Sequence, residues 1–76
     1  MNKQRRKEIQ SVIDQLHSLQ STIEALRDDE QEYYDNMPEN FQFGERGQAA
    51  EDAVSYMDDA ISSIEEAISS LESSAE

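Results

Sequence analysis

Apolar residues recur at alternating intervals of three and four in two long segments. The first segment covers about residues 3–36 and has no Gly or Pro among its apolar positions. The second covers about 45–74 and contains the successive heptads AVSYMDD, AISSIEE and AISSLES, from Ala53 onward. This spacing predicts two amphipathic helices. The apolar positions are Ile9, Val12, Leu16, Leu19, Ile23 and Leu26 in the first and Ala50, Val54, Met57, Ile61, Ile64, Ile68 and Leu71 in the second.

The residues between these segments, about 37–44, predict a short loop. Pro38 is the only proline, and it disfavours the helical conformation at the residue before it. We therefore expect the first helix to end near Asn36, with Gly44 as the non-helical residue before the second. Two helices of matched length joined by a short loop predict an all-α antiparallel hairpin of coiled-coil type, forming a single domain over residues 1–76.

The apolar positions also predict how the two helices face each other. If the turn is centred near residue 40, Ile9 faces Leu71 and Leu26 faces Val54, with four further apolar pairs between them. One flank of this hairpin is then smooth and partly apolar, and the other is acidic. A chain of 76 residues buries little surface alone, so we expect a homodimer that forms a four-helix bundle. The expected dimer flank consists of Ile13, Tyr34, Ala53, Ala60 and Ala67.

Charge is distributed unevenly along the chain, whose formal net charge is −12. Four of the six bases lie within residues 3–7, so from residue 8 onward only Arg27 and Arg46 accompany the eighteen acids. We expect the cationic start to lie beside Glu72 and Glu76 at the open end of the hairpin. The acidic body repels nucleic acid and anionic membrane and favours a partner with a basic surface.

Acidic pairs recur every seven residues in the second helix. Carboxylates crowded in this way either keep the helix soluble or form a surface that imitates nucleic-acid phosphates and occupies a basic groove. The residues that we expect on this partner-binding acidic face are Asp29, Glu51, Asp52, Asp58, Asp59, Glu65 and Glu66.

The loop brings aromatic residues together. Met37, Phe41 and Phe43 follow two tyrosines at the end of the first helix. They are expected either to close the hairpin as a small apolar plug or to form an exposed contact surface.

The sequence offers no set of residues for catalysis, so we expect no enzyme activity. There is no cysteine, His17 is the only histidine, and no Gly-rich phosphate loop is present. The acids between residues 28 and 35 lack the ligand spacing of a calcium loop, so no metal or cofactor is expected. The chain also lacks a long apolar run or the apolar core of a signal peptide, and we expect a cytoplasmic protein.

Two segments carry a resemblance to known proteins. RDDEQEYYDNMPEN, residues 27–40, and GERGQAAEDA, residues 44–53, resemble a set of small acidic helical-hairpin proteins of bacteriophages and prophages. These share an Asp-Asn-Met-Pro-Glu turn followed by Glu-Arg-Gly and an Ala-rich heptad helix, although this chain has Gly44 where a capping Ser is usual. The resemblance implies an inhibitor of host machinery, such as a defence or nucleic-acid-binding protein, in the cytoplasm of a bacterial host. It assigns no activity to particular residues.

Three functions follow as hypotheses. The first is an interaction protein that blocks a host factor through its acidic face. The second is an assembly or scaffold component that docks through its aromatic loop. The third is a small-ligand sponge formed between protomers.

Overall fold

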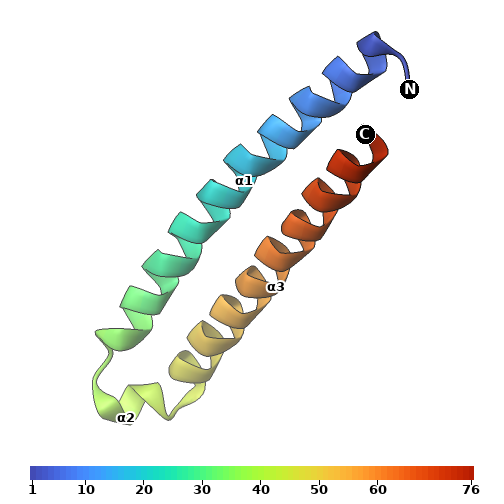
Figure 1. Cartoon of the computed structure of the whole chain (residues 1–76). Helices are drawn as coiled ribbons and strands as arrows, with labels where there is room; N and C mark the ends of the chain where they lie inside the picture. The colour runs from blue at the N-terminus through green and yellow to red at the C-terminus, as the bar shows by residue number, and fades with distance from the viewer.

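The chain forms a long helical hairpin. In the computed structural model, which describes all 76 residues, α1 (Lys3–Asp35) and α3 (Glu45–Ser74) lie side by side and antiparallel, with both termini at one end (Figure 1). The Cα atoms span 58 × 15 × 12 Å. The predicted all-α hairpin is confirmed, and both long helices begin and end within one residue of their expected bounds.

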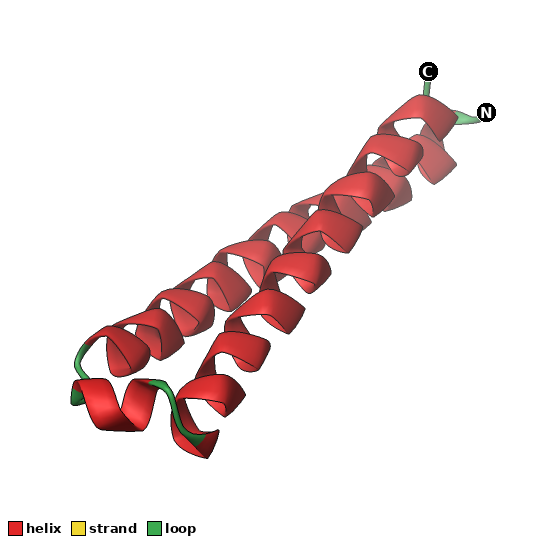
Figure 2. Cartoon of the chain, turned by 90° about the horizontal axis from the view of Figure 1, so that it is seen from below, coloured by secondary structure: helices red, strands yellow, loops and turns green.

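The connection contains a helical turn that the sequence pattern did not indicate. This element, α2 (Glu39–Gln42), lies across the end of the hairpin between the two long helices (Figure 2). Pro38 directly precedes this helix, and its carbonyl accepts hydrogen bonds from the amides of Phe41 at 2.9 Å and Gln42 at 3.1 Å. Pro38 therefore does more than end the first helix, because its fixed backbone also starts the next turn.

Close packing fixes α2 against both long helices. The Gln42 side-chain amide donates to the Tyr34 carbonyl near the end of α1 at 3.0 Å. On the other side, a Cβ added at Gly47 would overlap the backbone of Gln42. Gly47 is thus required for the approach of α2 to α3, whereas Gly44 has ordinary space around it and precedes α3 with extended backbone.

The α3 face of the core follows the predicted pattern. Ala50, Ile61 and Ile68 are buried, at 1%, 7% and 5% exposure. The remaining four predicted positions of this helix are half-buried: Val54, Met57, Ile64 and Leu71.

The face that α1 presents differs from the prediction. Ile13, which we had placed on the dimer flank, is the most buried residue of α1, at 4% exposure. Val12, Leu19 and Leu26, which we had placed in the core, are 45%, 55% and 54% exposed. Ile9, Leu16 and Ile23 stay at the interface, half-buried, and Gln20, Arg27 and Tyr34 join Ile13 there. Of the six core positions predicted for α1, three lie at the interface with α3 and three do not.

The physical reason lies in the width of the apolar face of α1. Side chains at Ile9, Val12 and Ile13 occupy neighbouring columns that together span more than a quarter of the helix circumference. A single antiparallel neighbour covers only part of such a face. The periodicity of apolar residues locates this face but does not choose which of its edges the neighbour covers.

No helix of this chain is long and apolar enough to span a membrane.

Candidate functional site

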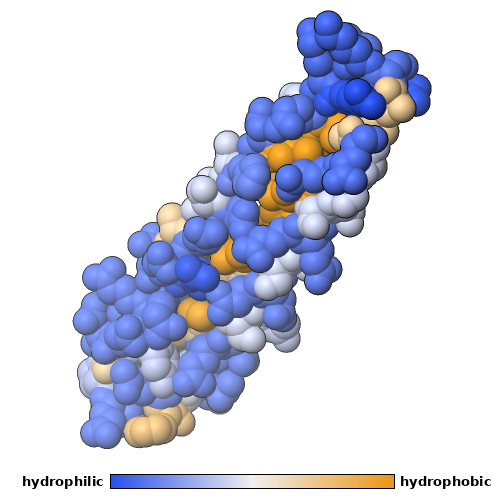
Figure 3. Space-filling view, viewed as in Figure 1, coloured by the Kyte–Doolittle hydropathy of each residue, from blue (hydrophilic) through white to orange (hydrophobic).

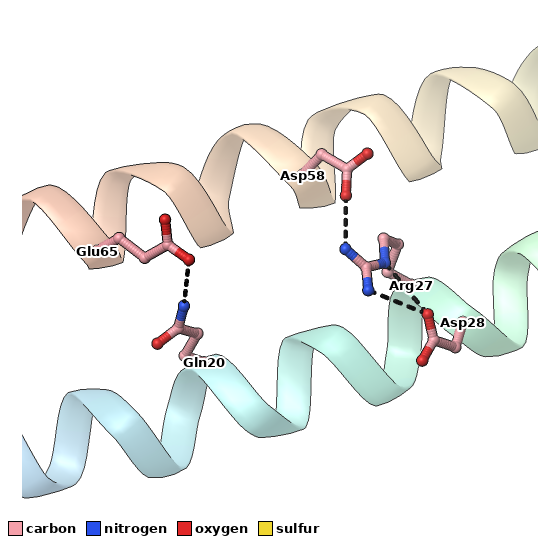
Figure 4. Close-up of polar contacts among 5 residues, drawn as sticks. All are labelled: Gln20, Arg27, Asp28, Asp58 and Glu65. Atoms are coloured by element: carbon pink, nitrogen blue, oxygen red, sulfur yellow. Dashed lines mark hydrogen bonds and ion pairs between the residues drawn. The ribbon is translucent and has the colours of Figure 1, made fainter.

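One long side of the hairpin carries a ladder of polar contacts between α1 and α3, drawn in part in Figure 4. The Gln20 amide donates to the Glu65 carboxylate at 2.9 Å. Seven residues along, Arg27 Nη1 donates to Asp58 at 2.9 Å, and its Nε and Nη2 contact the neighbouring Asp28 at 3.2 and 3.1 Å. We call these contacts, with the third described next, the polar ladder.

The third contact joins Tyr34 to Glu51 and completes the seven-residue spacing. The Glu51 carboxylate near the Tyr34 hydroxyl favours its protonated form and so raises the pKa of Tyr34 above its ordinary value, with partial desolvation adding to the effect. Arg27 behaves similarly, because hydrogen bonds to Asp58 and Asp28 raise its pKa. Both groups thus hold their protons more tightly in the folded chain.

The polar ladder divides the predicted acidic face into two columns. Glu51, Asp58 and Glu65 each contact α1, so they contribute to the packing of the hairpin. The second member of each pair has no contact with α1: Asp52, Asp59 and Glu66 are exposed, and only Asp52 has a partner, Gln48 on its own helix at 2.9 Å. We call Asp52, Asp59 and Glu66 the outer acidic column. Asp29 is exposed on α1 and belongs to neither column.

Most of the negative charge of the chain faces solvent without a counter-charge. Sixteen of the eighteen acids are exposed and the other two, Glu24 and Glu30, are half-buried. Arg27 is the only base in an ion pair. The bases within residues 3–7 make no ion pair with Glu72 or Glu76, although both termini lie at the open end (Figure 1).

A second candidate site is a hollow at the loop end. It measures about 330 Å³ and is open to solvent. The guanidinium of Arg46 lies on one wall, 5.8 Å from the centre of the Phe41 ring, a cation–π distance. The other lining residues are Tyr33, Asn36, Met37 and Pro38.

The loop aromatics do not close the hairpin as a plug. Phe41 is 47% exposed and Phe43 is 83% exposed, and only Met37 is half-buried. Of the three predicted loop-contact residues, Met37 and Phe41 line the hollow, whereas Phe43 lies outside it. The alternative of an exposed aromatic surface describes this end of the molecule.

The residues of the predicted dimer flank are not all available to a partner. Ile13 lies in the hairpin core, and Tyr34 is half-buried on the polar ladder. Ala53 and Ala60 are half-buried and Ala67 is exposed, so the α3 part of that flank remains accessible.

Sequence reasoning missed the roles of Gln20, Arg27 and Arg46. A signal for the first two was present, because they and Tyr34 recur every seven residues, as do the acids opposite them. Arg46 could be found only from the structure, which folds the loop back beside it. His17 is exposed, and no three His, Asp or Glu side chains are grouped so that they could hold a metal ion.

Comparison of the chain with family models, with curated proteins and with solved structures gives no match.

Proposed function

We propose that this chain is a non-enzymatic interaction protein that binds a partner with a basic surface, and that its role is to inhibit a host factor in the setting of a phage or prophage. The observation that carries this proposal is the uncompensated charge of the rod, because Arg27 is the only base that neutralises any acid. Such a surface attracts a basic protein over a range of about 8 Å at physiological ionic strength.

The outer acidic column is the part of this surface best suited to a partner. Its carboxylates are exposed and free of contacts with α1, and they follow one another at about 10 Å along α3. The inner column is a poorer candidate, since binding there would compete with Arg27, Gln20 and Tyr34. The proposed surface is thus narrower than the sequence alone suggested.

The test begins with capture of partners from a bacterial lysate by the immobilised chain at low and high salt. For a captured protein, we expect Asp59→Asn with Glu66→Gln to weaken binding at least about tenfold. The control is Ser11→Lys with Ser18→Lys, which changes the net charge by the same amount on an exposed part of α1, away from the outer acidic column. Equal weakening by both pairs would show that only net charge matters, and no weakening by the first pair would remove the acidic column from the proposal.

The loop hollow favours a second candidate function, an assembly component that docks through its aromatic end. Here Phe41→Ala with Phe43→Ala should abolish association, while the changes in the outer acidic column leave it intact. Tyr56→Ala is the matched control, because Tyr56 is an aromatic residue of α3, 74% exposed, that does not line the hollow. If Tyr56→Ala weakened association as much as the loop changes, the loop would not be the docking site.

We also propose that the working unit is a homodimer that forms a four-helix bundle. Only four apolar residues of the isolated hairpin are buried, which is little for a chain of 76 residues. Sedimentation equilibrium at micromolar concentration should give twice the mass of one chain, and a single-chain mass would overturn this part of the proposal.

A further inference from the structure

The hairpin has an apolar side, which we define by residues of both helices. On α1 a column of large apolar side chains recurs every seven residues, and each is about half exposed in the isolated hairpin. These residues are Val12, Leu19, Leu26 and Tyr33, at 45%, 55%, 54% and 52% exposure. On α3 the same side carries Ala53, Ala60 and Ala67, which are small enough for another helix to approach closely.

This apolar side lies opposite the polar ladder. Around α1, the column of Ile9, Leu16 and Ile23 faces α3, with the ladder column on one side of it and the Val12 column on the other. A partner packed on the apolar side would therefore continue the hairpin core without touching the ladder. Figure 3, which is viewed as Figure 1, shows apolar side chains only as a narrow strip between the two long helices, with hydrophilic side chains on both sides of it.

Two estimates of the area left to be covered lie on either side of the area of a standard interface. The chain exposes 5575 Å², whereas a compact monomer of this size exposes about 4,700 Å², an excess of about 900 Å². From Val12 to Tyr33 the apolar side is about 32 Å long and two helices, about 20 Å, wide, which gives about 600 Å². Each partner of a standard protein interface buries about 800 Å².

Charge identifies the partner and its orientation. The bases within residues 3–7 are exposed at the open end and make no ion pair. Five acids lie at the other end of the same helix: Asp28, Asp29, Glu30, Glu32 and Asp35. These two groups of opposite charge are separated by most of the length of the rod, so one chain cannot bring them together.

We propose that the apolar side is covered by a second copy of the chain whose loop lies at the opposite end of the bundle. The α1 helices then run antiparallel about a two-fold axis near Thr22, and the bases of each chain lie at the loop end of its partner, where Asp35 and Glu39 are the acids nearest to them along the bundle. In the same arrangement Leu19 lies near Leu26 of the partner subunit, and Val12, a small side chain, lies near the large Tyr33 of the partner subunit. A bundle with both loops at one end would instead place bases beside bases and acids beside acids.

This inference rests on the proposed homodimer and specifies its interface. The first experiment tests the surface by sedimentation equilibrium. Leu19→Glu with Leu26→Glu should abolish the dimer, because both side chains become charged at the centre of the interface. Gln10→Glu with His17→Glu adds acids at the same seven-residue spacing on an exposed part of α1 away from the apolar side, and it should leave the dimer intact. A dimeric Leu19→Glu/Leu26→Glu chain would overturn the proposed surface.

The second experiment tests the orientation without disturbing the interface. The chain has no cysteine, so Gln10→Cys can be spin-labelled at a single site. With the axis near Thr22, the two labels are separated by about 36 Å along the bundle, since 24 residues rise 1.5 Å each. A separation below about 20 Å, the spacing of neighbouring or diagonal helices, would show both loops at one end and overturn the orientation. A monomer mass would instead overturn the homodimer itself, and partner capture is measured separately.

A third experiment tests the charge pairing between copies. Arg5→Glu with Arg6→Glu, and separately Asp35→Lys with Glu39→Lys, should each weaken the dimer about tenfold or more. The four changes combined should restore most of the loss, because the opposite charges face each other again. Additive weakening in the combined chain, or strengthening by the first pair alone, would contradict the proposed pairing.

Discussion

The two long sides of the hairpin differ in how their side chains are satisfied. On the ladder side, Gln20, Arg27 and Tyr34 of α1 reach acids of α3. On the apolar side, Leu19 and Leu26 are more than half exposed and contact solvent. Both sides repeat every seven residues, so they are built from the same helical periodicity.

This difference describes how α1 is rotated about its axis. A more extensive apolar interface would result from turning the Val12 column toward α3, but Gln20, Arg27 and Tyr34 would then lose their partners. The structure retains the polar contacts and leaves the apolar column exposed. The polar side chains on one side of the hairpin thereby find partners within a single chain, whereas the other side leaves large apolar side chains exposed, which the proposed second copy would cover.

The largest effect is expected when two residues that are neighbours in the sequence are compared. Ile13 is buried in the hairpin core, whereas Val12 is half exposed on the apolar side. Ile13→Ala should lower the free energy of unfolding by about 2 to 4 kcal/mol at every protein concentration, because it leaves a cavity in the hairpin core. Val12→Ala should act mainly through association, so its cost in urea unfolding should depend on protein concentration. Equal, concentration-independent costs would mean that the two sides do not differ in this way.

The next effect concerns the loop that holds the two sides in place. Gly47→Ala should destabilise the chain by about 1 to 3 kcal/mol, because the new methyl group overlaps the Gln42 backbone and displaces α2. Gly44→Ala is the control and should cost less than about 1 kcal/mol, since its Cβ would make ordinary contacts. Thermal unfolding measures both, and a Gly47→Ala chain as stable as Gly44→Ala would contradict the observed packing.

A smaller effect is expected from the ion pairs of the polar ladder. Arg27→Met should lower the melting temperature slightly, because Asp58 and Asp28 lose their only ion-pair partner while the side chain keeps its length. The contacts are close to solvent, so the loss should shrink with added salt. Arg46→Met removes the other base of the acidic body, one without an ion pair, and should change the melting temperature less.

The smallest effect is a pH dependence at Tyr34. Its raised pKa means that the folded chain holds the phenolic proton more tightly than the unfolded chain. The stabilisation is fully present below the ordinary tyrosine pKa of about 10 and is lost as the pH rises through the raised value. The stability gap between the native chain and Tyr34→Phe should therefore close at alkaline pH. Tyr56→Phe, on the exposed surface of α3, should show no such closing gap.

Heptad spacing within the sequence was enough to predict two helices, their bounds and the core face of α3. These features depend on local backbone preferences and on one dominant apolar column, with Pro38 ending the first helix. The exposed acidic pairs could also be predicted, because their seven-residue spacing places them on one side of α3. The short helix α2 could not be predicted, since its single turn depends on the close approach of Gln42 to Gly47.

Only the tertiary structure decided which edge of α1 faces α3. That helix has two adjacent apolar columns, one beginning at Ile9 and the other at Val12. Hydrophobic periodicity does not distinguish which of them lies closer to the neighbouring helix. The edge that faces α3 is the one with hydrogen bonds and an ion pair between residues 31 and 45 positions apart, Arg27 with Asp58 and Gln20 with Glu65. Contacts of this kind form between specific atoms in three dimensions, so they divide the acids of α3 into inner and outer columns and leave one apolar side of the hairpin open.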